Sequence, residues 1–200
     1  MSRYKIIEQQ GLNYLTLTVV GWIDIFSRKR YRDIILESLR YCREHKGLHV
    51  VGWVIMTNHL HLIVFTETLE LSHVLRDFKK FTAFKILESI NVETESRREW
   101  LLYMFKYFAT INPNNRNFQF WQQDNHPIEL WSLPVIWQKL NYIHDNPVRA
   151  GIVADPTHFV YSSAVDYYCA KNGLLEIDLM EPIGPMLPSG YYFKLNFVRV

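Results

Sequence analysis

Two histidines stand two residues apart in an apolar run of the sequence, His59 and His61 in His-Leu-His-Leu-Ile-Val. Because side chains alternate between the two faces of a β-strand, both imidazoles would share one face, with Leu60 and Leu62 on the other. Two neighbouring imidazoles can bind one divalent metal ion. The alternative is that both histidines only line a half-buried strand. The pair is therefore a candidate metal site.

Tyr142 is the second candidate for chemistry, because it lies outside the apolar stripe of the helix predicted over residues 133–145. At about 100° per residue, that stripe is formed by Ile136, Leu140 and Ile143. Tyr142 instead shares a face with Gln138 and Asn146, each one helical turn away. A hydroxyl between two carboxamides can form a site. The alternative is a surface tyrosine that packs over its helix.

The hydrophobic pattern around these residues predicts alternating strands and helices. Strands are expected at residues 12–22, 48–56, 59–66 and 117–123, and helices at residues 31–46, 70–89 and 133–145. Gly47 is expected to end the first helix, Ser132 to cap the last one and Pro147 to stop it. A turn at residues 57–58 would place the histidine pair at the start of the return arm of a hairpin.

The helix predicted over residues 70–89 has an apolar side and a basic side. The residues expected to point inward are Leu71, Val74, Leu75, Phe78 and Phe81. The basic residues are Arg76, Lys79, Lys80 and Lys85. A charge run of this kind is usually an ordinary solvated face, although it also suits contact with a polyanion.

The composition is typical of one globular domain. Of the 200 residues, 48% are hydrophobic and 21% are charged. The net charge is +2, and the surplus of Lys and Arg lies within residues 1–150, which include the histidine pair. Cys42 and Cys169 lack metal-binding spacing, and the sequence has neither an apolar signal core nor an apolar run of membrane-spanning length. We therefore expect a cytoplasmic protein.

The domain organisation is expected to be simple. Residues 1–172 are predicted to form one domain, interrupted at about residues 91–116 by a partly helical insertion or loop. Residues 173–200 are rich in Pro and Gly and are predicted to form an irregular C-terminal arm. The sequence has no Walker-type loop, no dinucleotide-binding glycine motif and no Gly-x-Ser-x-Gly nucleophile motif, which argues against those classes of enzyme.

Four stretches, in this order, carry a resemblance to a known family. They are Gly52-Trp-Val-Ile-Met-Thr-Asn-His-Leu-His-Leu-Ile63, Phe78-Lys-Lys-Phe-Thr82, Phe120-Trp-Gln122 and Tyr142-Ile-His-Asp-Asn-Pro-Val-Arg-Ala-Gly151. With them the chain resembles the single-tyrosine HUH transposases, and more closely their branch associated with repetitive extragenic palindromes (REP). The resemblance covers roughly residues 10–170. The insertion and the C-terminal arm depart from it.

The resemblance implies an α+β fold, with a ferredoxin-like antiparallel sheet flanked by helices and Tyr142 on a helix of the C-terminal half. It implies a metal-dependent endonuclease and strand transferase that cleaves single-stranded DNA next to hairpins. Tyr142 would be the nucleophile and would form a 5′-phosphotyrosine intermediate. The implied ligands of Mg²⁺ or Mn²⁺ are His59, His61 and Asn146.

The resemblance also implies roles for other polar residues. Those expected to contact DNA phosphates are Lys79, Lys80, Arg149 and Arg76. Weaker site candidates are Gln122, His126, His144 and Gln138. Two other functions remain open, namely a domesticated, catalytically silent protein that binds DNA or RNA hairpins, and a phosphoesterase that uses water. Relatives act either as homodimers or as monomers, and the sequence does not distinguish these.

Overall fold

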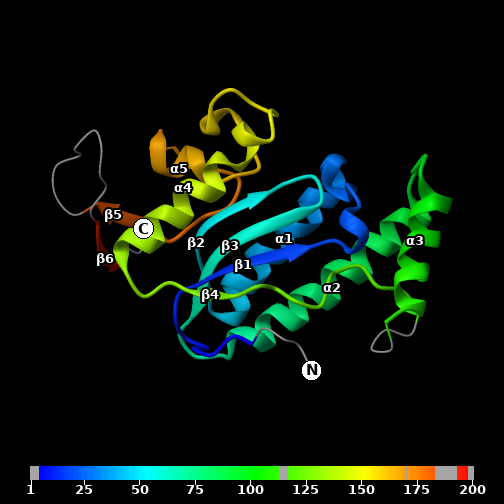
Figure 1. The fold of residues 1–200 in the computed structure, drawn as a ribbon, viewed down its shortest axis with the longest axis horizontal. Helices are drawn as coiled ribbons and strands as arrows, with labels where there is room; N and C mark the ends of the chain where they lie inside the picture. Colours follow the sequence, from blue (N-terminus) through cyan, green and yellow to red (C-terminus); the bar gives the residue numbers. More distant parts are fainter. Residues whose placement is uncertain (1–4, 113–116, 170, 183–192, 198–200) are drawn as a thin grey trace.

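The computed structural model describes residues 5–112, 117–169, 171–182 and 193–197 (Figure 1). Its helices and strands are, in chain order, β1 (Asn13–Thr18), α1 (Lys29–Lys46), β2 (Leu48–Ile55), β3 (His59–Thr66), α2 (Leu71–Val92), α3 (Arg98–Thr110), β4 (Ile128–Glu129), α4 (Leu133–Arg149), α5 (Ala164–Tyr168), β5 (Met180–Pro182) and β6 (Phe193–Phe197). Three short 3₁₀ segments complete them, η1 (Val20–Trp22), η2 (Ile25–Ser27) and η3 (Pro156–His158).

The main sheet is antiparallel and has the strand order β2-β3-β1-β4. Strands β2 and β3 form a hairpin, and β1 lies between β3 and β4. Together with α1 after β1 and α2 after β3, this gives the β-α-β-β-α-β order of a ferredoxin-like fold. The α+β prediction is therefore confirmed.

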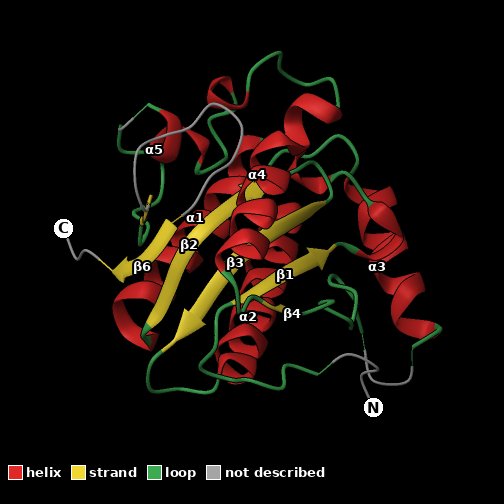
Figure 2. Cartoon of the chain, turned by 60° about the vertical axis from the view of Figure 1, so that its left-hand side comes forward, coloured by secondary structure: helices red, strands yellow, loops and turns green. Residues whose placement is uncertain are grey.

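Helices cover both faces of this sheet. Helices α1 and α2 pack against each other on one face, and α4 crosses the other (Figure 2). The contact with α4 is close at Gly52 of β2, because a Cβ atom there would lie 2.6 Å from Leu140 Cδ2 and 2.9 Å from Ile143 Cδ1. Only glycine lets the apolar stripe of α4 approach the sheet this closely.

Most of the predicted elements are confirmed. Helix α1 ends at Gly47, whose φ of 59° is the left-handed conformation that favours glycine. The strand predicted over residues 12–22 stops at Thr18, because Gly21 and Trp22 both have positive φ and form η1 instead. The strand predicted over residues 117–123 is reduced to a single bridge, between Trp121 and Val19.

Two further expectations are wrong. Pro147 does not stop α4, which continues to Arg149. The proline lacks only its own N–H group, and the N–H groups of Ala150 and Ile152 still donate to carbonyls of the last turn. Phe81 of α2 does not point inward, since 52% of its side chain is exposed.

The insertion between α2 and β4 contains α3 and is tied to the start of α1. The side chain of Glu95, which precedes α3, is fully buried and accepts hydrogen bonds from Arg30 (2.7 Å) and from the hydroxyl of Tyr31 (3.0 Å). Phe108 of α3 packs against Gly21 of η1. The described part of the insertion therefore packs onto the folded body, at the opposite end of the molecule from β5 and β6 (Figure 1).

The predicted C-terminal arm is described at residues 173–182 and 193–197, and the rest of it lies outside the described residues. Strands β5 and β6 pair with each other. Asp178 accepts hydrogen bonds from Arg43 of α1 (2.6 Å) and from the backbone N–H of Val50 (3.1 Å), so this segment lies against the outer edge of β2 at Val50. Whether residues 1–172 and 173–200 are separate units stays a prediction. None of the helices in the described part of the chain is long and apolar enough to cross a membrane.

Candidate active site

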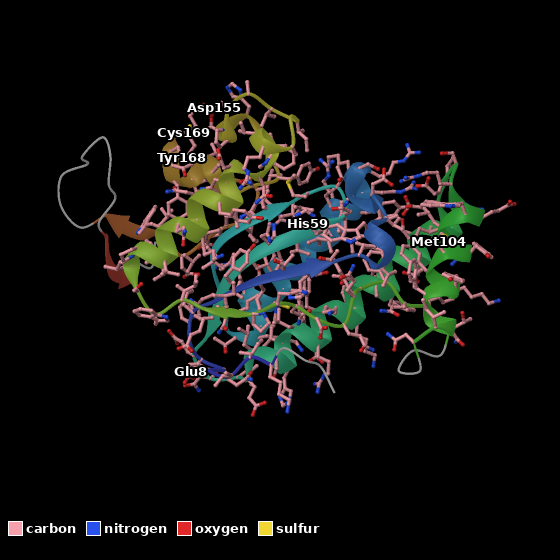
Figure 3. All side chains as sticks on the ribbon, in the orientation of Figure 1. Glu8, His59, Met104, Asp155, Tyr168 and Cys169 are labelled. Atoms are coloured by element: carbon pink, nitrogen blue, oxygen red, sulfur yellow. The ribbon has the colours of Figure 1, made fainter. Side chains whose placement is uncertain are left out.

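The histidine pair lies on the face of the sheet that α4 crosses. His59 and His61 point to the same side of β3, and their ring centroids are 4.7 Å apart. The antiparallel register sets them opposite Thr18 and Thr16 of β1, respectively. Figure 3 labels His59 at the start of β3. The alternation of side chains in the sequence therefore brings the imidazoles together, as predicted.

One ring nitrogen of His61 is held by hydroxyl groups of β1. Its Nδ1 lies 2.8 Å from the hydroxyl of Tyr14 and 2.9 Å from Oγ1 of Thr16. The Tyr14 ring also stacks on the imidazole, with the centroids 5.4 Å apart. Bonds of this kind fix the orientation of a metal-binding imidazole and its tautomer. With Nδ1 as the donor to one of these hydroxyls, the lone pair of His61 is on Nε2, which can then bind a ligand.

His59 is oriented by the residue before it. Its Nδ1 lies 2.6 Å from Oδ1 of Asn58, an oxygen that can only accept, so Nδ1 carries the proton. Asn58 is held in turn because its Nδ2 donates to the carbonyl of Trp22 (3.3 Å). The lone pair of His59 is then on Nε2. When Nδ1 of His61 is also protonated, both histidines offer Nε2 to a ligand.

Burial keeps both imidazoles neutral. Desolvation lowers the pKa of His59. It lowers the pKa of His61 to about 3, with further contributions from His59 and from the cation of Lys139. A neutral imidazole is the form that binds a metal ion, so neither histidine has to lose a proton at neutral pH.

Helix α4 places Tyr142 beside His61 of the same chain. The two rings are 5.6 Å apart, and the side chain of Tyr142 is 38% exposed. Two cations lie close to the Tyr142 ring, Lys139 Nζ at 5.8 Å and the Arg149 guanidinium at 5.6 Å. A partly exposed tyrosine ring thus lies next to His61, with two cations near the ring.

Asn146 lies one turn after Tyr142 on the same face of α4. Its Nδ2 donates to the carbonyl of Tyr142 at 2.8 Å, which leaves Oδ1 as the atom that can bind a cation. Within the described residues, no cluster of three His, Cys, Asp or Glu side chains could hold a metal ion by itself. A third protein ligand next to His59 and His61 would have to be of another type, and a carboxamide oxygen suits Mg²⁺ and Mn²⁺.

The weaker candidates are not gathered at this site. His144 is 1% exposed and lies on another side of α4, where its Nε2 is 2.8 Å from Ser163 Oγ and its Nδ1 is 3.2 Å from the hydroxyl of Tyr168. Figure 3 labels Tyr168 on α5. Gln138 is exposed, one turn before Tyr142. Gln122 and His126 lie in the segment that follows the outer edge of β1.

The basic residues of α2 lie elsewhere. Arg76, Lys79 and Lys80 line a groove of about 680 Å³ between α2 and the segment 118–125. Lys79 is directed inward, since its ammonium donates to the carbonyl of Gln122 (2.6 Å) and to Oδ1 of Asn125 (2.8 Å). Burial lowers its pKa to about 8. Of the residues predicted to contact DNA, only Arg149 lies beside Tyr142.

The sequence reasoning missed the residues that surround His61. Tyr14, Thr16 and Lys139 each contact it or Tyr142, and none carries a motif of its own. The available signal was the alternation of Tyr14, Thr16 and Thr18 on one face of a strand. Without the register of β1 against β3, this alternation does not show that Tyr14 and Thr16 contact His61.

Comparison with solved structures identifies the fold. A REP-associated tyrosine transposase bound to a REP hairpin matches with a TM-score of 0.55 and 17% sequence identity, over 87% of this chain and 90% of that one. A candidate transposase from Deinococcus radiodurans R1 matches with a TM-score of 0.40 and 14% identity, over 72% of this chain and 96% of that one. No protein-family model and no curated protein sequence matches the chain. The first similarity shows that the chain has the fold of the REP-associated transposase, and the second is too low to support an argument.

Proposed function

We propose that this chain, which has the fold of a REP-associated tyrosine transposase, is itself a transposase-type endonuclease and strand transferase. Its substrate would be single-stranded DNA, cleaved next to a hairpin through a 5′-phosphotyrosine intermediate. The observation that carries the proposal is the 5.6 Å separation between the rings of Tyr142 and His61 within one chain. A fold that served binding alone would not need an accessible tyrosine beside two oriented, neutral imidazoles.

The reaction would proceed through Tyr142. Its hydroxyl oxygen attacks the phosphorus of the scissile phosphodiester, and the bond from phosphorus to the 3′ oxygen breaks. The phenolic proton leaves to solvent, and the 3′ oxygen takes up a proton to become a free hydroxyl. Because the new phosphotyrosine bond conserves the energy of the old one, attack by a second 3′-hydroxyl joins strands without a nucleotide cofactor.

The cations around Tyr142 would assist this step. Negative charge grows on the tyrosine oxygen as its proton leaves, and on the phosphate as the bond forms. The ammonium of Lys139 and the guanidinium of Arg149 lie near the ring and stabilise such charge by electrostatic attraction. Arg149 can also form two parallel hydrogen bonds to a phosphate, which orients it for attack.

A divalent ion completes the proposed site, with Mn²⁺ or Mg²⁺ held by His59, His61 and Asn146. When bound, the ion supplies Lewis-acid polarisation of a non-bridging phosphate oxygen and alignment of the phosphate. The bonds at Nδ1 of both histidines support this ligand set, as does the bond from Asn146 Nδ2 to the carbonyl of Tyr142, which does not use Oδ1. Isothermal titration with Mn²⁺ should show binding to the wild-type protein and none to His59→Ala or His61→Ala.

The test of the proposal is trapping of the covalent intermediate. Purified protein is incubated with hairpin-containing single-stranded DNA and Mn²⁺, and the products are separated on a denaturing gel. We expect an adduct with the wild-type protein and none with Tyr142→Phe. The matched control is Tyr103→Phe, which removes the hydroxyl of another exposed tyrosine, 66% exposed on α3, and should leave the adduct intact.

Each other outcome refutes a part of the proposal. Cleavage that survives Tyr142→Phe would indicate a phosphoesterase that uses water. Hairpin binding without cleavage, across a broad set of hairpins, would indicate a domesticated binding protein. An adduct that forms equally well in the presence of a strong chelator would refute the metal requirement.

A further inference from the structure

Trp22 is an exposed aromatic residue in a backbone conformation that bulky residues rarely adopt. Its φ is 55°, and 60% of its side chain is exposed. Gly21, directly before it, has a φ of 60°, so two consecutive residues are in the left-handed region. In that region glycine is unstrained and Asn is tolerated, whereas a residue with a large side chain is an outlier. Stability of the fold therefore gives no reason for a tryptophan here.

The turn that carries Trp22 is held in place from two sides. A Cβ atom at Gly21 would lie 2.6 Å from the ring of Phe108, so α3 packs directly against this turn. On the other side, the carbonyl of Trp22 accepts a hydrogen bond from Asn58, the residue that orients His59. These contacts involve the backbone of the turn, and they would persist with any side chain at position 22.

The indole ring itself lies beside the histidine pair. Its centroid is 6.0 Å from that of His59, and the two rings meet edge to face with an angle of 73° between them. A ring held this close to the proposed ligands, with most of its surface open to solvent, can stack on a flat apolar partner. A base of single-stranded nucleic acid is such a partner, and it would be supplied by the substrate at this site.

We propose that Trp22 is the stacking platform for one unpaired base next to the phosphate held at His59 and His61. The inference rests on the proposed function, because that function brings single-stranded DNA to the histidine pair. Stacking on a base offsets the backbone strain at position 22 only in the complex, which explains why the strained residue is a large aromatic one. The arrangement would fix the position of the scissile phosphate relative to Tyr142.

The test measures binding apart from cleavage. Every variant is made in the Tyr142→Phe background, and its affinity for a fluorescent stem-loop oligodeoxynucleotide with single-stranded flanks is measured with Mn²⁺ present. Trp22→Asn removes the ring while suiting the left-handed backbone, and Trp22→Phe keeps an aromatic face. We expect Trp22→Asn to weaken binding roughly 5- to 150-fold, the usual effect of losing one stacked base, and Trp22→Phe to bind nearly as well as the parent.

Two controls separate stacking from other effects. Phe84→Ala removes an aromatic side chain that is also 60% exposed but lines a groove between α1 and α2, on the other face of the sheet, and it should bind normally. The urea midpoint of Trp22→Asn should be unchanged or higher, because the variant loses strain. With flanks in which single nucleotides are made abasic in turn, one position should weaken binding to the parent but not to Trp22→Asn.

The outcomes distinguish this inference from the proposed function. Normal binding by Trp22→Asn, with adduct formation by the wild-type protein, overturns the role of Trp22 and leaves the transposase proposal standing. Loss of binding by Trp22→Asn, with no adduct from the wild-type protein, supports the stacking platform and refutes cleavage. A wild-type protein that binds no single-stranded DNA overturns both. A change in oligomeric state on Trp22→Asn would assign the ring to contact with a second copy and also overturn the inference.

Discussion

His144 provides a quantitative test of the packing of α4, because the structure buries this residue and leaves Tyr142, two residues earlier, partly exposed. The two ring nitrogens of this buried histidine lie near the hydroxyls of Ser163 and Tyr168, and the Tyr168 hydroxyl donates to Asn141. That bond uses the proton of Tyr168, so its oxygen accepts from Nδ1 of His144. Burial lowers the pKa of His144 to about 3. The residue is therefore expected to be a neutral part of the core and not a metal ligand.

The effect on stability follows from proton linkage. The unfolded chain takes up a proton at this histidine as the pH falls through about 6.5, whereas the folded protein does not, so stability is lost as the pH falls. Between about pH 7.5 and pH 5 the loss from His144 is about 2 kcal/mol. Because folded His144 is still neutral at pH 5, this figure is set by the pKa in the unfolded chain.

The assay compares urea unfolding of the wild-type protein and of His144→Phe at both pH values. Phenylalanine keeps a ring against Tyr167, whose centroid is 5.3 Å from that of His144. Other histidines contribute equally in the two proteins, so they cancel in the comparison. The free energy of unfolding of the variant, relative to that of the wild-type protein, should be about 2 kcal/mol higher at about pH 5 than at about pH 7.5. A difference that is the same at both pH values would refute the reasoning. Loss of Mn²⁺ binding by the variant would show that His144 is a ligand after all.

Three further predictions concern the candidate site. Thr16→Val removes a hydroxyl that holds Nδ1 of His61, so it should weaken Mn²⁺ binding about 10- to 100-fold while the urea midpoint changes little. Equal affinity of the variant and the wild-type protein in titration calorimetry would contradict this prediction. Gly52→Ala forces a methyl group against Leu140, so it should cost about 1–3 kcal/mol of stability and reduce adduct formation. A variant that is as stable as the wild-type protein would show instead that α4 can shift freely. Because one chain holds both groups, a mixture of Tyr142→Phe and His61→Ala proteins should form no adduct, and recovered activity would indicate a site shared between two chains.

Features that depend on local periodicity could be predicted from the sequence. The two-residue period of a strand put His59 and His61 on one face, and the structure places their rings 4.7 Å apart. The angular spacing of a helix left Tyr142 outside the apolar stripe of α4, and its side chain is 38% exposed. Gly47 ends α1 because glycine adopts the left-handed conformation without strain. In each case the physical cause lies within a few residues of chain.

Features that depend on which elements meet could not be predicted in this way. Tyr142 and His144 are two residues apart on α4, yet one contacts His61 and the other is buried against Ser163. At about 100° per residue they point to nearly opposite sides, and only the packing of α4 across the sheet decides which side holds the site. The inward direction of Lys79 likewise depends on the segment that runs along β1.

The sequence by itself therefore determined which side chains share a face, and through its motifs it indicated the fold and the candidate chemistry. The tertiary structure decided which faces meet, and so it added the hydroxyls that orient His61, the cations beside Tyr142 and the strained position of Trp22. The reason is that periodicity fixes directions relative to one helix or strand. Contacts between elements depend on strand register and on close packing across the whole core, which no single stretch of sequence contains.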